Sequence, residues 1–145
     1  MSEAKVTIAG VADEPGIAAK LFRPLADAGV NVDMIVQNVS TAGATDISFT
    51  VPKSDLADAV GVASGLAIGD VSSDENVGKI SVIGAGMKSN PGVAAQMFET
   101  LAQAGINIQM LSTSGIRISA VVDGAQAEQA VGVLHEAFEL DRPVA

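Results

Sequence analysis

Two Pro-Gly pairs are the residues of this chain best suited to chemistry. Pro15–Gly16 and Pro91–Gly92 each stand directly before a helical pattern. The first amides of a helix have no intrahelical partner and lie at the positive end of the helix dipole, so they can donate to a carboxylate. Gln37, which both donates and accepts, suits a ligand's hydroxyl or main-chain groups. The same pairs also fit plain helix starts, and both interpretations stay open at this point.

The roles of several other polar residues also stay open. Asp13 and Glu14 could bind an ammonium group or a divalent cation, or they could complement the dipole of the helix that follows. His135 falls between apolar residues at helical spacing, which favours a helix surface or the edge of a core. Arg117 lies in a strand pattern, where it could pair with an acid or touch a partner protein.

Composition excludes most enzyme classes. The chain has no cysteine and one histidine, which excludes disulfides, thiolate metal sites and thiol nucleophiles and makes a Ser-His-Asp triad hard to assemble. The GAG run at residues 84–86 is too short, and wrongly followed, for a phosphate loop. We therefore expect no catalytic residue, no metal and no cofactor.

Net charge and aromatic content argue against several classes of binding partner. With 17 acidic and 8 basic residues the formal net charge is −9, which repels nucleic acid and anionic lipid. Trp and Tyr are absent and Phe occurs four times, so base-stacking platforms are not expected. No apolar stretch reaches about 18 residues, and the first residues lack the pattern of an export signal. We expect a soluble cytoplasmic protein without a nucleic-acid or membrane partner.

An internal repeat organises the 145 residues, of which 48% are apolar and 17% charged. The run KVTIAG at residues 5–10 returns as KISVIG at residues 79–84, 74 residues later. The run PGIAAKLFRPLADAGVNVDM at residues 15–34 matches PGVAAQMFETLAQAGINIQM at residues 91–110 at eleven of twenty positions. The chain is therefore a tandem of one fold unit.

Each copy predicts a strand, a helix, a hairpin of two strands and a second helix. In the first copy these are Val6–Gly10, Pro15–Gly29, Val32–Val39 with Thr45–Val51, and Ser54–Leu66. In the second copy they are Ile80–Gly84, Pro91–Gly105, Ile108–Thr113 with Arg117–Val122, and Ala125–Phe138. Gly29 and Gly105 are expected to end their helices as C-cap glycines, and Gly43 and Gly115 to lie in the hairpin turns.

A fourth strand is needed to close each sheet. In the first copy it falls within Asp70–Asn76, whereas the ending LDRPVA of the second copy offers almost no strand pattern. The pattern indicates an α+β fold of two ferredoxin-like β-α-β-β-α-β domains with antiparallel sheets and helices on one face, at residues 2–76 and 77–145.

Pro24 interrupts the first predicted helix. A proline inside a helix removes one N–H and clashes with the preceding turn, at a cost of about 3 kcal/mol. We therefore predict a kink or an early break at Pro24.

The sequence resembles a known family. The runs DEPGIAAKLF, AGVNVDMIVQNVS, TDISFTV, GKISVIGAGMKSNPGVAAQMFETLAQAGINIQMLSTS and IRIS are similar to the paired ACT domains of the regulatory (beta) subunit, or C-terminal regulatory region, of aspartokinase, most of all the actinobacterial type. The resemblance implies ACT domains that bind threonine, with lysine as a further effector, and feed back on the first step of the aspartate pathway. It also implies a catalytic (alpha) subunit of aspartokinase as partner.

The resemblance assigns a threonine pocket. Its residues would be Gly16 and Ala18 at the helix start, Gln37 in a strand, and Asn107 with Ile108 from a strand of the second unit, on a partner chain. A free amino acid is a zwitterion, so a receptor must offer donors to its carboxylate and acceptors to its ammonium group.

Lysine would sit nearby, against the acids Asp13 and Asp33. The family typically carries a Glu and a His at two further positions of that site, where this chain has Ile17 and Asn90. This departure removes a carboxylate that would meet the lysine ammonium group, so the resemblance supports threonine binding better than lysine co-binding. The edge strands of an unclosed ferredoxin-like sheet favour side-by-side pairing, so a homodimer is expected.

Three other functions remain open. The chain could be a stand-alone ACT-domain sensor with no kinase partner, or a structural assembly protein whose pocket stays empty. A small ferredoxin-like enzyme such as an acylphosphatase would need an arginine beside an N-terminal phosphate loop, and no arginine precedes Arg23.

Overall fold

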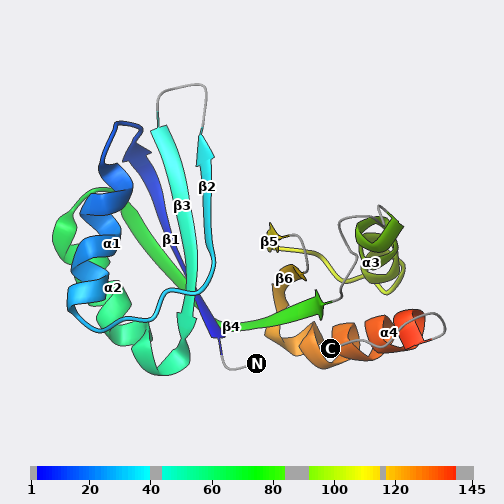
Figure 1. Ribbon diagram of the computed structural model, residues 1–145. Helices are drawn as coiled ribbons and strands as arrows, with labels where there is room; N and C mark the ends of the chain where they lie inside the picture. Colours follow the sequence, from blue (N-terminus) through cyan, green and yellow to red (C-terminus); the bar gives the residue numbers. More distant parts are fainter. Residues whose placement is uncertain (1–2, 40–43, 84–91, 115–116, 140–145) are drawn as a thin grey trace. The chain divides into compact units, whose positions relative to one another are not determined.

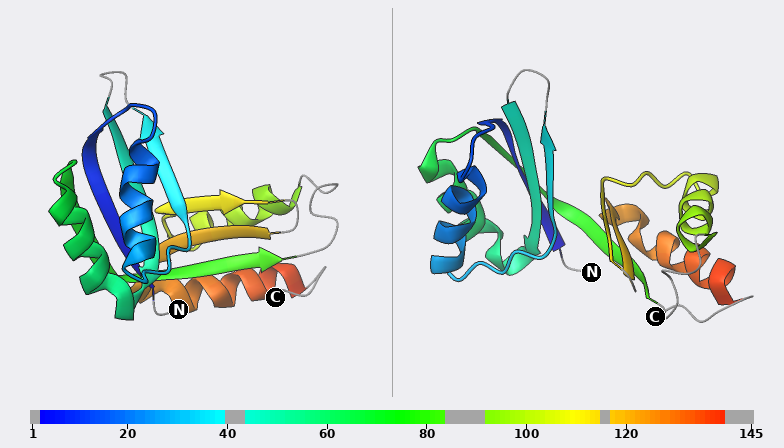
Figure 2. Two further views of the ribbon diagram at one scale, coloured as in Figure 1. Left: turned by 60° about the vertical axis from the view of Figure 1, so that its left-hand side comes forward. Right: turned by 45° about the horizontal axis from the view of Figure 1, so that its top comes forward.

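A computed structural model describes residues 3–39, 44–83, 92–114 and 117–139 (Figure 1). The chain divides into two compact units, residues 2–75 and residues 76–145. The predicted turn glycines Gly43 and Gly115 lie outside the described residues. In each unit both helices lie on one face of the strands (Figure 2).

The first unit follows the predicted order of elements. They are β1 (Glu3–Ala12), α1 (Ile17–Asp27), β2 (Ile35–Val39), β3 (Ala44–Pro52), α2 (Leu56–Leu66) and the first part of β4 (Asp70–Ile83). The strand order is β2-β3-β1-β4, and β3 pairs antiparallel with both β1 and β2. The antiparallel α+β arrangement predicted from the sequence is confirmed.

The core of the first unit lies between the helices and one face of the strands. Alternate residues of β1 and β3 point to this face, as the period of two in a strand requires. They meet the apolar stripe of α1 and the small residues of α2. The fully buried members are Ala4, Val6, Ile8, Val11, Leu21, Leu25, Phe49, Val51, Ala59 and Ala63.

The second unit repeats the pattern. Its elements are the rest of β4, α3 (Gly92–Gln103), β5 (Met110–Thr113), β6 (Arg117–Asp123) and α4 (Ala127–Glu139). The strand order is β4-β6-β5, with antiparallel pairs throughout. Its core is Ile80, Val82, Val93, Met97, Leu101, Ile106, Ile118, Ala120, Val122, Ala127, Ala130 and Leu134.

One long strand replaces two predicted ones. The sequence predicts a strand within Asp70–Asn76 and another from Ile80, but β4 runs without interruption from Asp70 to Ile83. Val71 packs against the first core, and Val77–Ile83 pairs with β6. A glycine inside a strand pattern marks either a bend or a close approach of another segment, and Gly78 marks a close approach. Here it is buried beneath the first residue of α4, Ala127.

The helix ends predicted at Gly29 and Gly105 are confirmed. Gly29 has φ +79°, and its N–H donates to the Ala26 carbonyl while the Val30 N–H donates to the Leu25 carbonyl, both at 3.0 Å. The same pair of bonds follows α3, where Gly105 has φ +74°. This is the Schellman arrangement, in which a residue in the left-handed region satisfies the last carbonyls of the helix.

The break predicted at Pro24 is wrong. Helix α1 continues past Pro24 to Asp27, and the Pro24 carbonyl accepts a hydrogen bond from the Ala28 N–H at 3.0 Å. Leu21 and Leu25, both fully buried, anchor the helix on either side of the proline. The proline removes one helical bond, that to the carbonyl of the exposed Lys20, which water can satisfy. A kink at Pro24 stays a prediction.

The close packing of β4 on α4 gives a test. A Cβ atom added at Gly78 would lie 2.5 Å from the Ala127 Cβ. We therefore expect Gly78→Ala to lower the free energy of unfolding by about 1–3 kcal/mol, because a methyl group is forced into a filled space. Gly61→Ala is the matched control: it adds the same methyl group on α2 with no atom within 4 Å, so it should raise stability by about 0.5–1 kcal/mol. Urea unfolding of both variants measures this, and equal effects would contradict it.

Candidate functional site

A Pro-Gly turn leads into helix α1. The Ile17 N–H donates to the Glu14 carbonyl at 3.2 Å, and Gly16 has φ +86° and ψ −2°. With proline at the second position and a left-handed glycine at the third, this is a type II turn. The sequence places Pro15 in the first helical turn, and this is wrong: the helix begins at Ile17 with Gly16 as its N-cap.

The start of α1 presents unsatisfied donors. No side chain caps it, and its first turn contains no acidic residue. The first helical bond runs from the Lys20 N–H to the Gly16 carbonyl at 3.0 Å. The amide of the exposed Ala18 precedes this bond, so it is available to an external acceptor at the positive end of the dipole.

A β-bulge directs the chain from β1 toward this helix. The register slips between Ile8, which pairs with Ile47, and Val11, which pairs with Thr45. Gly10 lies inside the bulge with φ +73°, and its N–H donates to an Asp46 carboxylate oxygen at 3.0 Å. The sequence predicts that β1 ends at Gly10, but the strand continues across the bulge to Ala12. The signal for the bulge was a glycine within an apolar strand pattern.

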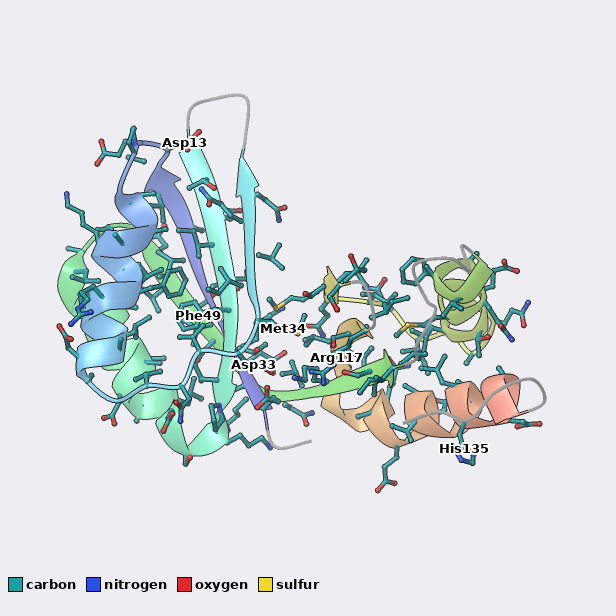
Figure 3. All side chains as sticks on the ribbon, viewed as in Figure 1. Asp13, Asp33, Met34, Phe49, Arg117 and His135 are labelled. Carbon is teal, nitrogen blue, oxygen red and sulfur yellow. The ribbon has the colours of Figure 1, made fainter. Side chains whose placement is uncertain are left out.

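Gln37 lies in the middle of β2. It pairs with Ile47, a buried core residue, so the Gln37 side chain projects on the helix-covered side of the strands, where it is exposed. Val39 of β2 and Val11 of β1 both pair with Thr45 of β3. The end of β2, the end of β1 and the turn into α1 therefore lie at one end of the first unit, where Figure 3 shows Asp13.

Asp33 lies at the opposite end of the first unit (Figure 3). Its N–H donates to the Thr50 carbonyl at 2.9 Å, and Thr50 pairs with Lys5 near the start of β1. Asp13, by contrast, follows Ala12, which pairs with Ala44. Six positions along β3 at about 3.3 Å per residue separate the two aspartates by about 20 Å. One unit therefore does not bring Asp13 and Asp33 onto one ligand.

Ile17 belongs to the core. Its side chain is 6% exposed and packs in the cluster that contains Leu21 and Leu25. Its N–H is already bonded within the turn. At this position the chain therefore offers a ligand neither a side chain nor a free amide.

Asn107 and Ile108 lie just before β5, not within it. The sequence predicts a strand from Ile108, but the ladder begins at Met110, after the Gln109 N–H donates to the Val121 carbonyl at 2.7 Å. Asn107 is exposed and Ile108 half-buried. Ile108 lines an open hollow of about 320 Å³ together with Phe98, Gln109, Met110 and Leu111.

The strand β2 starts late in the same way. Its predicted start was Val32, but pairing begins at Ile35. Before that point the Met34 N–H donates to the Thr50 hydroxyl at 3.0 Å and the Met34 carbonyl accepts from the Thr50 N–H. The hydroxyl takes the place of a ladder bond, which the sequence pattern does not reveal.

The remaining candidates are scattered. Asn90 lies outside the described residues, His135 is exposed on α4 and Arg117 is exposed at the start of β6. In the described ranges no group of three or more His, Asp or Glu side chains is arranged to hold a metal ion. None of the described helices has both the length and the apolar character of a membrane span.

Comparison with known families identifies the repeated unit. A model described as ACT domain matches residues 6–64 and 80–138. The chain is 48% identical to an aspartokinase of Corynebacterium glutamicum over 96% of its own length and 34% of that protein, and 49% identical to an aspartokinase of Mycolicibacterium smegmatis over the same shares. The chain thus spans about a third of the length of the curated relatives it matches.

Solved structures match over nearly their whole chains. A chain in the crystal structure of aspartokinase alpha and beta subunits is 43% identical, with a TM-score of 0.88 over 95% of this chain and 93% of that one. The ligand-free regulatory subunit of aspartate kinase from Thermus thermophilus is 36% identical, with a TM-score of 0.89 over 94% and 93%. The 145 residues thus correspond to the regulatory region and include no kinase catalytic domain.

Proposed function

The chain belongs to the ACT-domain family and corresponds to the regulatory region of aspartokinases, and from this premise we propose that it binds threonine and thereby inhibits an aspartokinase catalytic subunit. The observation that supports the site most directly is the uncapped start of α1 behind Gly16, with Gln37 exposed on the helix-covered side of the strands in the same unit.

A zwitterion fits the groups at this end. The Ala18 amide and the dipole of α1 attract the carboxylate of an amino acid. Asp13, exposed in the preceding loop, is the acid that meets the ammonium group. Gln37 accepts from the threonine hydroxyl and donates to it in turn. Gly16 carries no side chain, so the ligand can approach the backbone.

Asn107 and Ile108 of a second copy complete the site in this proposal, which makes it a site at an interface between ACT domains. The half-buried Ile108 beside Phe98 offers an apolar surface to the threonine methyl group. Asn107 is exposed and offers an amide.

Lysine is the weaker effector in this proposal. Ile17 is buried and apolar, so no carboxylate meets the lysine ammonium there. Asp33 lies too far from Asp13 in one unit for both to hold the same molecule. A lysine bound at either end of the unit therefore meets one of the two aspartates and not both.

Inhibition requires differential affinity. A ligand shifts an equilibrium from 1:99 to 99:1 only if it prefers one state by about 5.5 kcal/mol. Threonine is small, and even the best small ligands gain about 1.5 kcal/mol per non-hydrogen atom at most. In a dimer two symmetric sites divide this free-energy difference between them. Each site must still satisfy most of the polar groups of its ligand.

A homodimer follows from the edges of the strand order. β2 and β5 are the end strands, and they expose large apolar side chains at equivalent positions of the repeat: Ile35 is 53% and Leu111 40% exposed. Open strand edges carrying apolar side chains favour pairing with another copy.

The alternative is a stand-alone amino-acid sensor that acts without a kinase. The two functions share the threonine site and differ in the partner. Retention of an aspartokinase catalytic chain on the immobilised protein, strengthened or weakened by threonine, supports the kinase function, whereas threonine binding without retention supports the stand-alone sensor.

Calorimetric titration with threonine tests the site. Gln37→Ala should weaken threonine binding about tenfold, because it removes one well-placed polar partner worth about 1.4 kcal/mol. Asn38→Ala is the matched control: Asn38 is the neighbouring exposed amide of β2, but it pairs with Asp46 and projects from the opposite face. It should change the affinity less than about threefold. Equal affinities for wild type and Gln37→Ala would remove Gln37 from the site.

Sedimentation velocity tests the dimer. Ile35→Lys places a charge on the exposed edge of β2 and should shift the protein from dimer toward monomer. Val131→Lys is the control, because Val131 is 43% exposed on α4, away from the strand edge. Loss of the dimer in both variants, or in neither, would count against pairing through β2.

A further inference from the structure

We propose that Asp46 is a positioning residue for the effector site: by holding the bulge at Gly10 it sets the path of the segment Asp13–Ala18. This inference rests on the proposed function of that segment as the place where an amino acid binds. Nothing in the sequence pattern marks Asp46, which reads as one polar residue of an alternating strand.

The bond joins two strands at the point where their register slips. The Gly10 N–H donates to an Asp46 carboxylate oxygen at 3.0 Å, across 36 residues of sequence. Within the bulge two residues of β1, Ala9 and Gly10, oppose one residue of β3. The extra residue has no ladder partner, so its amide would otherwise be left to water, and the carboxylate supplies the missing acceptor.

Beyond the bulge the chain is held by the buried side chain of Val11 and by its pairing with β3. On the β3 side two register pairs follow, Val11 with Thr45 and Ala12 with Ala44, before the loop begins at Asp13. Glycine has more conformational freedom than any other residue. The hydrogen bond to Asp46 therefore fixes the backbone at a glycine three residues before Asp13. The direction in which the chain leaves the bulge then sets the path of the residues that lead to the helix start.

Asp46 acts from the side of the sheet opposite to Gln37. Its neighbour Ile47 points into the core, so alternation turns Asp46 to the other face, where its register partner is Asn38. Asp46 is exposed and does not share the face on which Gln37 projects. Its effect on a ligand is therefore exerted through the backbone of the bulge.

The second unit lacks the acceptor. Matching Ile47–Ser48 with Ile118–Ser119 places Arg117 at the position of Asp46. A guanidinium group has donors only, so it cannot accept a hydrogen bond from a backbone amide. At the position of β6 that matches Asp46, the second unit thus has no carboxylate.

Three variants separate the bond from charge and from stability. Asp46→Ala removes both the acceptor and the charge. Asp46→Asn removes the charge but keeps an oxygen that accepts from Gly10. Asp55→Ala is the matched control: Asp55 accepts a backbone bond of the same kind and length from the Asn31 N–H, 3.0 Å, at the other end of the unit.

Threonine titration of these variants gives the first readout. Asp46→Ala should weaken binding about fivefold, the effect of one ordinary hydrogen bond, whereas Asp46→Asn and Asp55→Ala should stay within about twofold of wild type. Equal weakening by Asp46→Ala and Asp46→Asn would assign the effect to charge and overturn the positioning role. Equal weakening by Asp46→Ala and Asp55→Ala would assign it to stability and overturn it as well.

Amide hydrogen exchange of the ligand-free protein gives the second readout. In Asp46→Ala, the amides of Gly10 and of residues 13, 14 and 16–18 should exchange faster than in wild type, and in Asp55→Ala they should not. Unchanged exchange in Asp46→Ala overturns the inference whether or not threonine binds. If wild-type protein binds no threonine, the proposed function fails, while the exchange rates still decide whether Asp46 positions the segment.

Discussion

The hydrogen-bonded register of β3 between β1 and β2 is the constraint on which the candidate site depends. Thr45 of β3 pairs with Val11 on one side and with Val39 on the other. This shared partner brings the end of β1 and the end of β2 to one end of the sheet, although Val11 and Val39 are 28 positions apart in the sequence. A shift of the register by one residue would turn Gln37 to the other face of the sheet. It would also bring polar side chains of the same strand to the face that covers the core. The register therefore decides on which face of the sheet Gln37 lies.

Local signals in the sequence were enough to predict the order of elements and the ends of α1 and α3. Period-two and helical spacing gave the strands and helices, and the glycines at 29 and 105 ended α1 and α3 as predicted because a left-handed residue is a local requirement. Features that depend on tertiary packing could not be predicted from the sequence pattern. Pro24 stays inside α1 because the buried Leu21 and Leu25 hold the helix on either side, and β4 runs on past Gly78, which packs under Ala127 of a helix far away in the sequence.

The site was predictable only in part, for the same reason. Gly16 could be identified because a Pro-Gly turn before a helix is a local pattern. The separation of Asp13 from Asp33 could not, because it is set by which residues of β3 each end of the unit reaches. Ile17 occupies a position that the aspartokinase resemblance reserves for a charged side chain, yet its burial is decided by the apolar stripe of α1. Asp46 was missed because the Gly10 amide comes within hydrogen-bond distance of it only once β1 and β3 are paired.

The two units show where the fold tolerates change. In each, a hydroxyl pair joins the strand that opens the unit to the strand after the hairpin turn: Thr7 to Ser48 at 2.9 Å and Ser81 to Ser119 at 2.8 Å. These pairs lie in the middle of the ladders, where a mismatched polar group would weaken the pairing. Toward the ends of the same strands the units differ, with Asp46 against Arg117 and Thr50 against Val121. A strand end adjoins a loop, so an exchange there alters how the loop is held while the ladder stays intact. A duplicated sheet can therefore keep one framework and give its two helix starts different chemistry, which is what a regulatory unit that responds to one amino acid more strongly than to another requires.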